Sequence, residues 1–537
     1  MSSTDLEERE NMRIPFSQES RNDTVNGAWA AGRRRRTRGA LPAILTTLAA
    51  LLSVGPAHAN TPQAGGCDAA GSAEAAVLAR AAHLTTPRPR VIVTTDGEID
   101  DKASFHRFLL YTDEFDVQGL VYNSSRFHWA GNGSTIPSHG NWAGTTWMTD
   151  MLRGGYAQVY PNLVRHDPRY PTPARLASVV RVGNIENVGE MDKDTPGSDL
   201  IRQKLLDDRP GPLWLDTWGG TNTVARALKS IEDQYSGTAA WPEVQRKVSQ
   251  KALVYIILDQ DTTYKNYIAK NWPDVRVIMN NDQFQPMAYK WKSRVPASQL
   301  PYYQGPWMTE NIVKGPLNQD YPVGPRRAGG SDFEEGEFVS EGDSPSFTHH
   351  IANGLRSAED PTYGGWGGRF TRVKPHTWTD LPSYLGEAGN QVRDRNPETG
   401  TDDRSYPQAR WTGDLQNDFA ARVAWTTASD HRQANHAPVA SVPPGRLDIR
   451  VKPGQTVRLR ATAADPDRDA VTCKWWQYRE AGTYPGSVAI GRSDTLHPSF
   501  TVPADAQPGQ TIHLILQVTD EGTPPLTGYQ RVIATVK

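Results

Sequence analysis

Cysteine is almost absent from this chain of 537 residues, which contains only Cys67 and Cys473. The two cysteines lie in what we take to be different regions of the chain. They do not form a disulfide framework of the kind that stabilises small secreted domains. The sequence therefore predicts that stability comes from the burial of large cores rather than from covalent cross-links.

An excess of charge of either sign is also missing, since 58 Lys and Arg face 60 Asp and Glu, a formal net charge of −2. This balance gives no electrostatic reason to expect a nucleic-acid polymer as partner. Beyond residue 59 no segment has a long, uncharged apolar run, so no membrane span is expected there.

Proline, glycine and aromatic residues are plentiful instead, with 40 Pro, 46 Gly, 16 Trp and 19 Tyr. This composition is typical of a loop-rich α/β or β protein with a large aromatic surface. Aromatic faces stack on sugars and on bases, although most tryptophans of a folded protein belong to its core.

The first 59 residues have the pattern of an export signal. A basic stretch, Arg33 to Arg36 with Arg38, precedes the apolar stretch 40–54, and Ala57-His58-Ala59 supplies small residues for cleavage before Asn60. The apolar stretch is too short for a transmembrane helix. We predict a secreted or periplasmic protein and leave open whether the general or the twin-arginine route exports it.

A cluster of acids follows the first strong strand signal. Residues 91–95, Val-Ile-Val-Thr-Thr, predict a buried parallel strand, and Asp96, Asp100 and Asp101 come directly after it. The helical spacing of residues 103–111 places these acids at the carboxyl end of a strand, where open α/β sheets bind ligands. Like charges so close together require a proton or a cation, and oxygen ligands suit calcium or magnesium.

A simpler interpretation of the same acids is a solvated turn with Asp100 as the N-cap of the following helix. Short motifs of this kind often occur without any function. The position directly after a buried strand makes the two interpretations about equally good, so the rest of the chain has to decide.

Strands and helices alternate beyond this cluster, which predicts a mostly parallel, doubly wound α/β sheet. Further strands are expected at residues 115–123, 212–218, 252–258 and 275–279, and helices at 142–152, 200–206, 223–231, 346–355 and 415–427. The strand ends lead into polar segments around Asn123, Thr217 to Asn222, and Asp261. Because the carboxyl ends of parallel strands share one edge, we expect these segments beside the acidic cluster.

The pattern becomes all-β after Val439. Short alternating runs separated by turns predict an immunoglobulin-like β-sandwich. The predicted organisation is a signal segment 1–59, a linker 60–87, an α/β domain 88–433 and a sandwich domain 434–537. Four turn acids of the last domain, Asp465, Asp467, Asp469 and Asp520, are possible calcium ligands at one end of the sandwich, but solvated turns are the favoured interpretation.

Three segments carry a resemblance to a known family. Asp96 to Asp101, with its DxxxDD spacing after a Val/Ile strand, resembles the signature of nucleoside N-ribohydrolases, and Thr217 to Asn222 resembles their second segment. With Glu341 to Leu355 they make residues 88–430 most similar to the secreted nucleoside hydrolase-like family described as cellulose-binding proteins. That family carries an immunoglobulin-like C-terminal domain.

The resemblance implies a calcium site and a catalytic base. Asp96, Asp101 and Asp343 would be metal ligands, Thr217 would offer its backbone carbonyl, and Asp100 would be the general base that deprotonates the attacking water. Candidate substrate contacts, in the segments that follow the other strands, are Asn123, Trp218, Asn222 and Asp261.

Two positions depart from the ribohydrolase pattern. Thr94 stands where those enzymes usually carry a further aspartate, and Gly342 stands where many carry a histidine that helps the leaving base to depart. His128, His349 or another group would have to replace that acid. The metal site tolerates such changes better than the specificity for nucleosides does.

Three functions are compatible with these features. The favoured one is a calcium-dependent exported hydrolase of an N-glycosidic or related glycosidic bond. The second is a non-catalytic carbohydrate-binding protein of the same fold, and the third gives the metal a purely structural role. The expected partner is accordingly a sugar-containing small molecule or a polysaccharide such as cellulose.

Overall fold

The structure, a computed structural model, describes residues 67, 77, 80–81 and 83–537. The predicted signal segment, residues 1–59, lies outside these residues, as does most of the predicted linker 60–87. None of the helices in the described part of the chain has the length and apolar composition that a bilayer-spanning helix requires.

An eight-stranded sheet forms the centre of the α/β region, in the order β3-β2-β1-β4-β5-β6-β10-β9. Every neighbouring pair is parallel except β10 with β9. The strands are β1 (Arg90–Thr95), β2 (Asp116–Tyr122), β3 (Val180–Val182), β4 (Leu213–Thr217), β5 (Ala252–Ile257), β6 (Arg276–Asn280), β9 (Thr371–Lys374) and β10 (Thr377–Thr379). This confirms the predicted doubly wound sheet, whose strand order reverses between β1 and β4.

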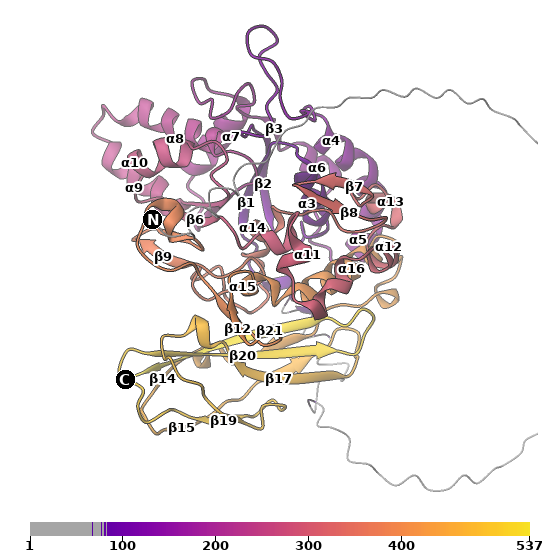
Figure 1. Cartoon of the computed structure of the whole chain (residues 1–537), viewed down its shortest axis with the longest axis vertical. Helices are drawn as coiled ribbons and strands as arrows, with labels where there is room; N and C mark the ends of the chain where they lie inside the picture. The colour runs from indigo at the N-terminus through magenta and orange to yellow at the C-terminus, as the bar shows by residue number, and fades with distance from the viewer. Residues whose placement is uncertain (1–66, 68–76, 78–79, 82) are drawn as a thin grey trace, which may run out of the picture. The chain divides into compact units, whose positions relative to one another are not determined.

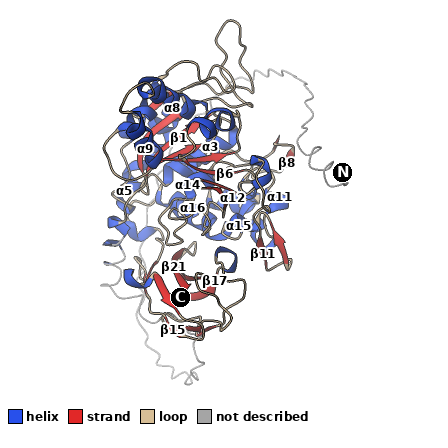
Figure 2. Ribbon diagram, turned by 90° about the vertical axis from the view of Figure 1, so that its left-hand side faces the viewer, coloured by secondary structure: helices blue, strands red, loops and turns tan. Residues whose placement is uncertain are grey.

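Helices cover both faces of this sheet (Figures 1 and 2). Ile92 of β1 packs with α7 (Pro196–Leu206), α8 (Asn222–Tyr235) and α9 (Trp241–Lys251). Its neighbours Val91 and Val93 point to the opposite face and pack with α3 (Ile99–Leu110), α14 (Ser344–Thr348) and α16 (Thr412–Trp425). Because both faces are buried, the strand is apolar at successive positions rather than alternating.

Two of the predicted helices differ from the observed ones. The predicted helix 346–355 is observed as α14 (Ser344–Thr348), and the chain beyond it turns at Gly354 (φ 89°), where a Cβ would lie 1.9 Å from the carbonyl oxygen of Tyr529. The predicted helix 142–152 starts later, as α4 (Trp147–Met151), and continues through a π-helical turn into α5 (Ala157–His166).

Shorter elements complete the α/β region. They are α6 (Pro173–Ala177), α10 (Ala269–Asn271), α11 (Trp291–Arg294), α12 (Gly305–Asn311), α13 (Gly315–Asn318), α15 (Tyr406–Ala409) and the hairpins β7 (Arg326–Ala328) with β8 (Ser331–Phe333) and β11 (Asp394–Asn396) with β12 (Thr401–Asp403).

The C-terminal region consists mainly of β-strands, as predicted. A four-stranded sheet has the order β14 (Asp448–Val451), β21 (Thr527–Val536), β20 (Thr511–Asp520) and β17 (Val471–Gln477). Smaller sheets contain β15 (Thr456–Arg458), β19 (Ser499–Thr501) and β18 (Ile490–Gly491), and β13 (Val439–Ser441) with β16 (Thr462–Ala464). Inward-facing side chains such as Val457, Trp475 and Leu516 form a core of their own.

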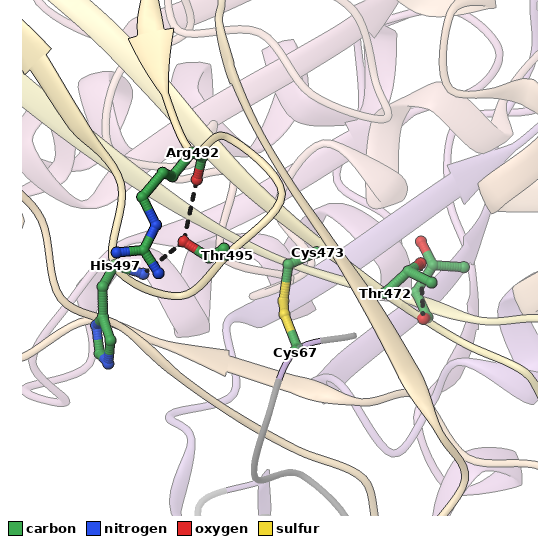
Figure 3. Close-up of a disulfide and its surroundings, with 7 residues drawn as sticks. Cys67, Thr472, Cys473, Arg492, Thr495 and His497 are labelled. Carbon is green, nitrogen blue, oxygen red and sulfur yellow. Dashed lines mark hydrogen bonds between the residues drawn. A yellow bond between two sulfur atoms is a disulfide. The ribbon is translucent and has the colours of Figure 1, made fainter. Parts of the chain in front are cut away.

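The two cysteines form a disulfide, which corrects the expectation that the chain has no covalent cross-link (Figure 3). Cys67 lies beside strand β17, where its backbone N–H donates to the carbonyl of Val471 at 3.4 Å, and its Cα is 5.8 Å from that of Cys473. The partners are 406 residues apart in sequence. Such a separation hides the pairing from sequence analysis, since only the folded chain brings the two together.

Candidate active site

The acidic segment begins at the end of strand β1 and continues into helix α3. Asp96 follows the strand directly, and Gly97 then turns the chain with φ 78°, a conformation that favours glycine. Helix α3 begins at Ile99 with Glu98 at its N-cap position, so Asp100 and Asp101 lie in its first turn. Asp100 is therefore not the N-cap that the simpler interpretation required.

The acids of this segment are buried rather than solvated. Asp96 is 1% exposed and Asp101 is 2% exposed, and Asp343, from the loop before α14, is 2% exposed. Carboxylate oxygens of Asp100, Asp101 and Asp343 lie within 4.8 Å of one another. The solvated-turn interpretation is therefore wrong, and the structure brings together acids that are more than 240 residues apart in sequence.

Burial disfavours the charged form of each of these carboxyl groups. Burial and the charge of Asp96 raise the pKa of Asp100 to about 7. Burial also raises the pKa of Asp101, with Asp96 as the largest neighbouring charge, and that of Asp343, with Asp100 as the largest. At neutral pH such a group of acids needs a bound cation or shared protons.

Several oxygens of this group are free to bind a ligand. Asp96 Oδ2, Asp100 Oδ1 and Asp343 Oδ2 are buried and have no hydrogen-bond partner among the described residues. Asp101 Oδ1, by contrast, accepts from the Thr95 hydroxyl at 2.5 Å. Carboxylate oxygens without protein partners are the donors that a hard cation such as calcium prefers, so the side chains present fit the predicted ion.

Thr217 ends strand β4 beside the acidic segment, since it pairs with Thr94 in the register of β1 and β4. Its hydroxyl donates to the carbonyl of Tyr255 at 2.9 Å. The side chain is thus engaged within the sheet, which leaves the backbone carbonyl as the group that Thr217 can offer to an ion.

Asn123 follows strand β2 and reaches the same edge of the sheet. Its amide N–H donates to the carbonyl of Gly220 at 2.5 Å, while its Oδ1 is buried and meets no donor in the described residues. A Cβ on Gly219 would lie 2.9 Å from this oxygen and 3.0 Å from the Cβ of Asp96. Glycine at position 219 thus allows Asn123 and Asp96 to share one site.

Two of the other predicted substrate contacts, Asn222 and Asp261, form hydrogen bonds within the protein. Asn222 Nδ2 donates to Ser124 Oγ at 2.9 Å and leaves Oδ1 buried, with no partner that the structure describes. Asp261 accepts from the backbone N–H of Asn222 at 2.8 Å and from the Thr263 hydroxyl at 2.7 Å, so both of its oxygens hold local structure. Asp261 therefore positions the start of helix α8.

Trp218 lies entirely in the core, against Phe108 and Phe347. Its indole N–H donates to Ser346 Oγ at 2.9 Å. A fully buried ring with a satisfied N–H cannot contact a substrate directly, so the prediction of Trp218 as a substrate contact is corrected: it packs beneath the loop that carries Asp343.

Sequence analysis gave no role to Glu98 and Tyr289. Glu98 lies inside the acidic motif, and burial, followed by the charge of Asp100, raises the pKa of its carboxyl group. The Tyr289 hydroxyl donates to Glu98 Oε1 at 3.0 Å. Glu98 is the fourth acid of the motif beside Asp96, Asp100 and Asp101, so the sequence could have indicated it. Tyr289 comes from an irregular region without any sequence signal.

Of the two histidines considered as replacement acids, only His128 lies at the site. Its Nδ1 is 3.8 Å from Asp96 Oδ2 and 3.6 Å from Glu98 Oε2. His349 is fully buried against the rings of Tyr255 and Phe370 and belongs to the core.

Comparison with known proteins agrees with this architecture. The family model described as "Cellulose-binding Sde182, nucleoside hydrolase-like domain" matches residues 90–370. The chain belongs to this family. The model of the "Cellulose-binding protein Sde0182, C-terminal domain" matches residues 456–536, which agrees with the predicted family and its appended β-domain.

The fold is shared with a solved structure. A nucleoside hydrolase-related hypothetical protein from Saccharophagus degradans, associated with carbohydrate metabolism, is 27% identical, with a TM-score of 0.66 over 84% of this chain and 100% of that chain. A plant nucleoside hydrolase is 12% identical, with a TM-score of 0.29 over 63% of this chain and 99% of that chain. Among curated proteins, none matches this chain.

Proposed function

We propose that this protein is an exported, calcium-dependent hydrolase of an N-glycosidic or related glycosidic bond. The observation that carries the proposal is the group formed by the buried Asp101 and Asp343 with the partly buried Asp100, whose free carboxylate oxygens lie beside Asp96 at the point where the strand order reverses. Ligands of open α/β sheets bind at this point. The family's nucleoside hydrolase-like fold supports the same reaction class.

Each side chain has a defined task in this proposal. Asp96, Asp101, Asp343 and the carbonyl of Thr217 would hold the ion. Bound calcium would polarise a water molecule and help to orient the sugar hydroxyls. Asp100 would accept the proton of the attacking water at Oδ1, a buried carboxylate oxygen without a hydrogen-bond partner among the described residues.

The sugar would be recognised by two amide oxygens. Asn123 Oδ1 and Asn222 Oδ1 are both buried and lack donors within the described residues, so each can accept a hydrogen bond from a sugar hydroxyl. Their amide N–H groups are already bound to the protein, which fixes the direction in which each oxygen points.

The leaving group receives less help than in the ribohydrolases, because Gly342 offers no acid beside Asp343 and burial lowers the pKa of His128, the candidate replacement acid at the site. A substrate whose leaving group departs without protonation is therefore favoured. We expect 4-nitrophenyl glycosides to be cleaved faster than purine nucleosides.

The decisive experiment compares Asp100→Asn with the wild-type protein. If the protein is an enzyme, the variant should lose turnover of 4-nitrophenyl glycosides by at least about 100-fold, the usual contribution of a general base, and should keep calcium binding in calorimetry. Asp208→Asn, a change at a fully exposed acid, is the matched control and should alter neither property. Unchanged turnover in Asp100→Asn would contradict the assignment of the base.

A second candidate function, carbohydrate binding without turnover, is favoured by a separate observation. A cleft of about 450 Å³ is lined by the partly exposed rings of Tyr302, Tyr406 and Trp476. Lys474 and Gln517, which pair across β17 and β20, line it as well. The cleft combines these aromatic rings with polar side chains, which could hydrogen-bond to sugar hydroxyls, and the family is described as cellulose-binding.

Turnover and adsorption to cellulose, measured on the same variants, distinguish the two candidates. A binding protein should lose adsorption to cellulose on Trp476→Ala and be unaffected by Asp100→Asn. Trp378→Ala, at a partly exposed tryptophan of strand β10, is the control for the loss of an aromatic side chain.

A further inference from the structure

Two acids at one end of the sandwich are buried without a full set of partners. Asp465, in the turn between β16 and β17, is 0% exposed, and Asp520, at the end of β20, is 3% exposed. Solvated turns were the favoured interpretation of these acids from the sequence. Their burial excludes it, because a solvated carboxylate would be open to water.

Both acids use one oxygen in the same way. Asp465 Oδ1 accepts from the backbone N–H groups of Asp467 and Asp469, each at 2.9 Å. Asp520 Oδ1 accepts from the N–H groups of Gly522 and Leu526, also at 2.9 Å. Each carboxylate therefore fixes the shape of its own loop with Oδ1.

The second carboxylate oxygen of each acid makes no hydrogen bond. Asp465 Oδ2 and Asp520 Oδ2 are both buried and have no hydrogen-bond partner in residues 83–537 or the other described positions. A buried carboxylate oxygen without a donor costs free energy unless a proton or a cation compensates it. Because the two oxygens lie on neighbouring loops, a single bound cation would compensate both of them.

The two turns lie side by side, since Val471 pairs with Asp520 and the N–H of Glu521 donates to the carbonyl of Ala470 at 2.9 Å. Burial raises the pKa of Asp465 to about 7, and the charge of Asp520 contributes to the increase. Burial raises the pKa of Asp520 to about 6. Two buried carboxyl groups on adjacent turns, each with an unpartnered oxygen, offer oxygen ligands of the kind that a hard cation prefers.

We propose that Asp465 and Asp520 form a second calcium site, separate from the acidic site of the α/β sheet. This inference goes beyond the proposed hydrolase function and does not depend on it. The ion would bind Oδ2 of both acids and connect the 465–469 turn to the 520–526 turn.

The connection between α16 and the sandwich also reaches this site. Asn435 Nδ2 donates to Asp520 Oδ1 at 3.0 Å and to the carbonyl of Pro524 at 2.8 Å. An ion at the two acids would therefore also stabilise the place where the connecting segment meets the sandwich.

The neighbouring histidines do not form a better metal site. His431, His436 and Asp467 have ligand atoms within 4.8 Å of one another. The rings of His431 and His436, however, are stacked 3.6 Å apart at 8°, so no ion can lie in the planes of both. Asp467 Oδ2 already accepts from Nδ1 of His436 at 2.9 Å and from its backbone N–H at 2.7 Å.

Counting bound ions in the full chain tests the proposal. Equilibrium dialysis against radioactive calcium up to about 5 mM, above the range of extracellular calcium modules, should find two ions on the wild type. The double variant Asp465→Asn/Asp520→Asn and the variant Asp96→Ala should each bind one. Asparagine keeps the Oδ1 acceptor of each loop, so the double variant is expected to fold.

The outcomes separate the two sites. If only the sandwich site is absent, the wild type binds one ion, the double variant still binds one and Asp96→Ala binds none, and the present inference is overturned. If only the α/β site is absent, the wild type binds one ion and the double variant binds none. Asp494→Asn, at an exposed acid of the sandwich, is the control and should bind as many ions as the wild type.

A second measurement uses the unaltered protein. Calcium should slow hydrogen exchange at the amides of Asp467, Asp469, Gly522 and Leu526, which donate to the two acids. Exchange at these amides that is unchanged by calcium, or slowed by zinc but not by calcium, would overturn the proposal.

Discussion

Arg107 of helix α3 and Glu341 of the loop before α14 form an ion pair in which both side chains are completely buried. Arg107 Nη2 lies 3.2 Å from Glu341 Oε1, and the guanidinium group stacks 3.9 Å from the ring centre of Phe419. The Tyr321 hydroxyl also donates to Glu341. Since α3 carries Asp100 and Asp101 and the loop carries Asp343, this pair determines how the two parts of the acidic site meet.

Removal of one partner of this pair should be costly. We expect Arg107→Met to lower the free energy of unfolding by about 3–5 kcal/mol, because Glu341 would be left charged in the core. Denaturant titration measures the loss. Arg327→Met, which breaks an exposed pair with Asp332, is the control and should change stability by less than about 1 kcal/mol. Equal effects of the two substitutions on stability would contradict the prediction that Arg107 and Glu341 form a buried ion pair.

Gly342→Ala should disturb the proposed base without unfolding the protein. The new Cβ would lie 2.7 Å from Asp100 Oδ2, the end of a side chain that can rotate away. Turnover should therefore fall by roughly tenfold or more, as expected when a proton acceptor is misplaced, while the melting temperature stays nearly constant. Gly237→Ala, with no described atom within 4 Å of the new Cβ, should leave both quantities unchanged.

The disulfide predicts a specific pattern of thiols and stabilities. Unfolded but unreduced protein should contain no free thiol by thiol titration, because Cys67 and Cys473 are paired. Cys473→Ser should lower the free energy of unfolding by about 2–4 kcal/mol through loss of the cross-link. Cys67→Ser should have the same effect. The double variant should be no less stable than either single variant. Two free thiols in the wild type would refute the pairing.

His349 should make the stability depend on pH. Burial, together with the charge of His350, lowers the pKa of His349 to about 3, whereas an unfolded histidine titrates near 6.5. The unfolded chain thus binds the proton first, so stability is complete above pH 6.5 and decreases as the pH falls toward 3. His349→Phe removes this dependence, and its stability relative to wild type should rise by about 2 kcal/mol between pH 7 and pH 5. A constant difference over this range in denaturant titrations would contradict the prediction.

Much of the architecture could be predicted from the sequence, because it depends on local patterns. The run Val91-Ile92-Val93 specifies a strand that is buried on both faces, and alternation with helices specifies a parallel sheet. Helix ends were harder: the helix containing Phe347 is shorter than predicted, and the segment that follows it contacts strand β21 closely at Gly354.

The candidate site was predictable to the extent that its residues follow strands. Asp96, Asp100, Asp101 and Asn123 all follow β1 or β2, so their common location could be inferred. Trp218 also follows a strand, but packing turns its ring into the core. Tyr289 comes from an irregular segment, whose path depends on long-range contacts and not on a repeat in the sequence.

The sequence by itself determined which chemistry is available here: a cluster of carboxylates after a buried strand, a glycine-rich loop after β4, and an all-β C-terminal region. Only the tertiary structure decided which acids are buried and which of their oxygens lack partners, at Asp343 as at Asp465 and Asp520. It alone also paired Cys67 with Cys473 and Arg107 with Glu341. The physical reason is that burial and pairing depend on what surrounds a side chain in space, and these neighbours come from distant parts of the chain.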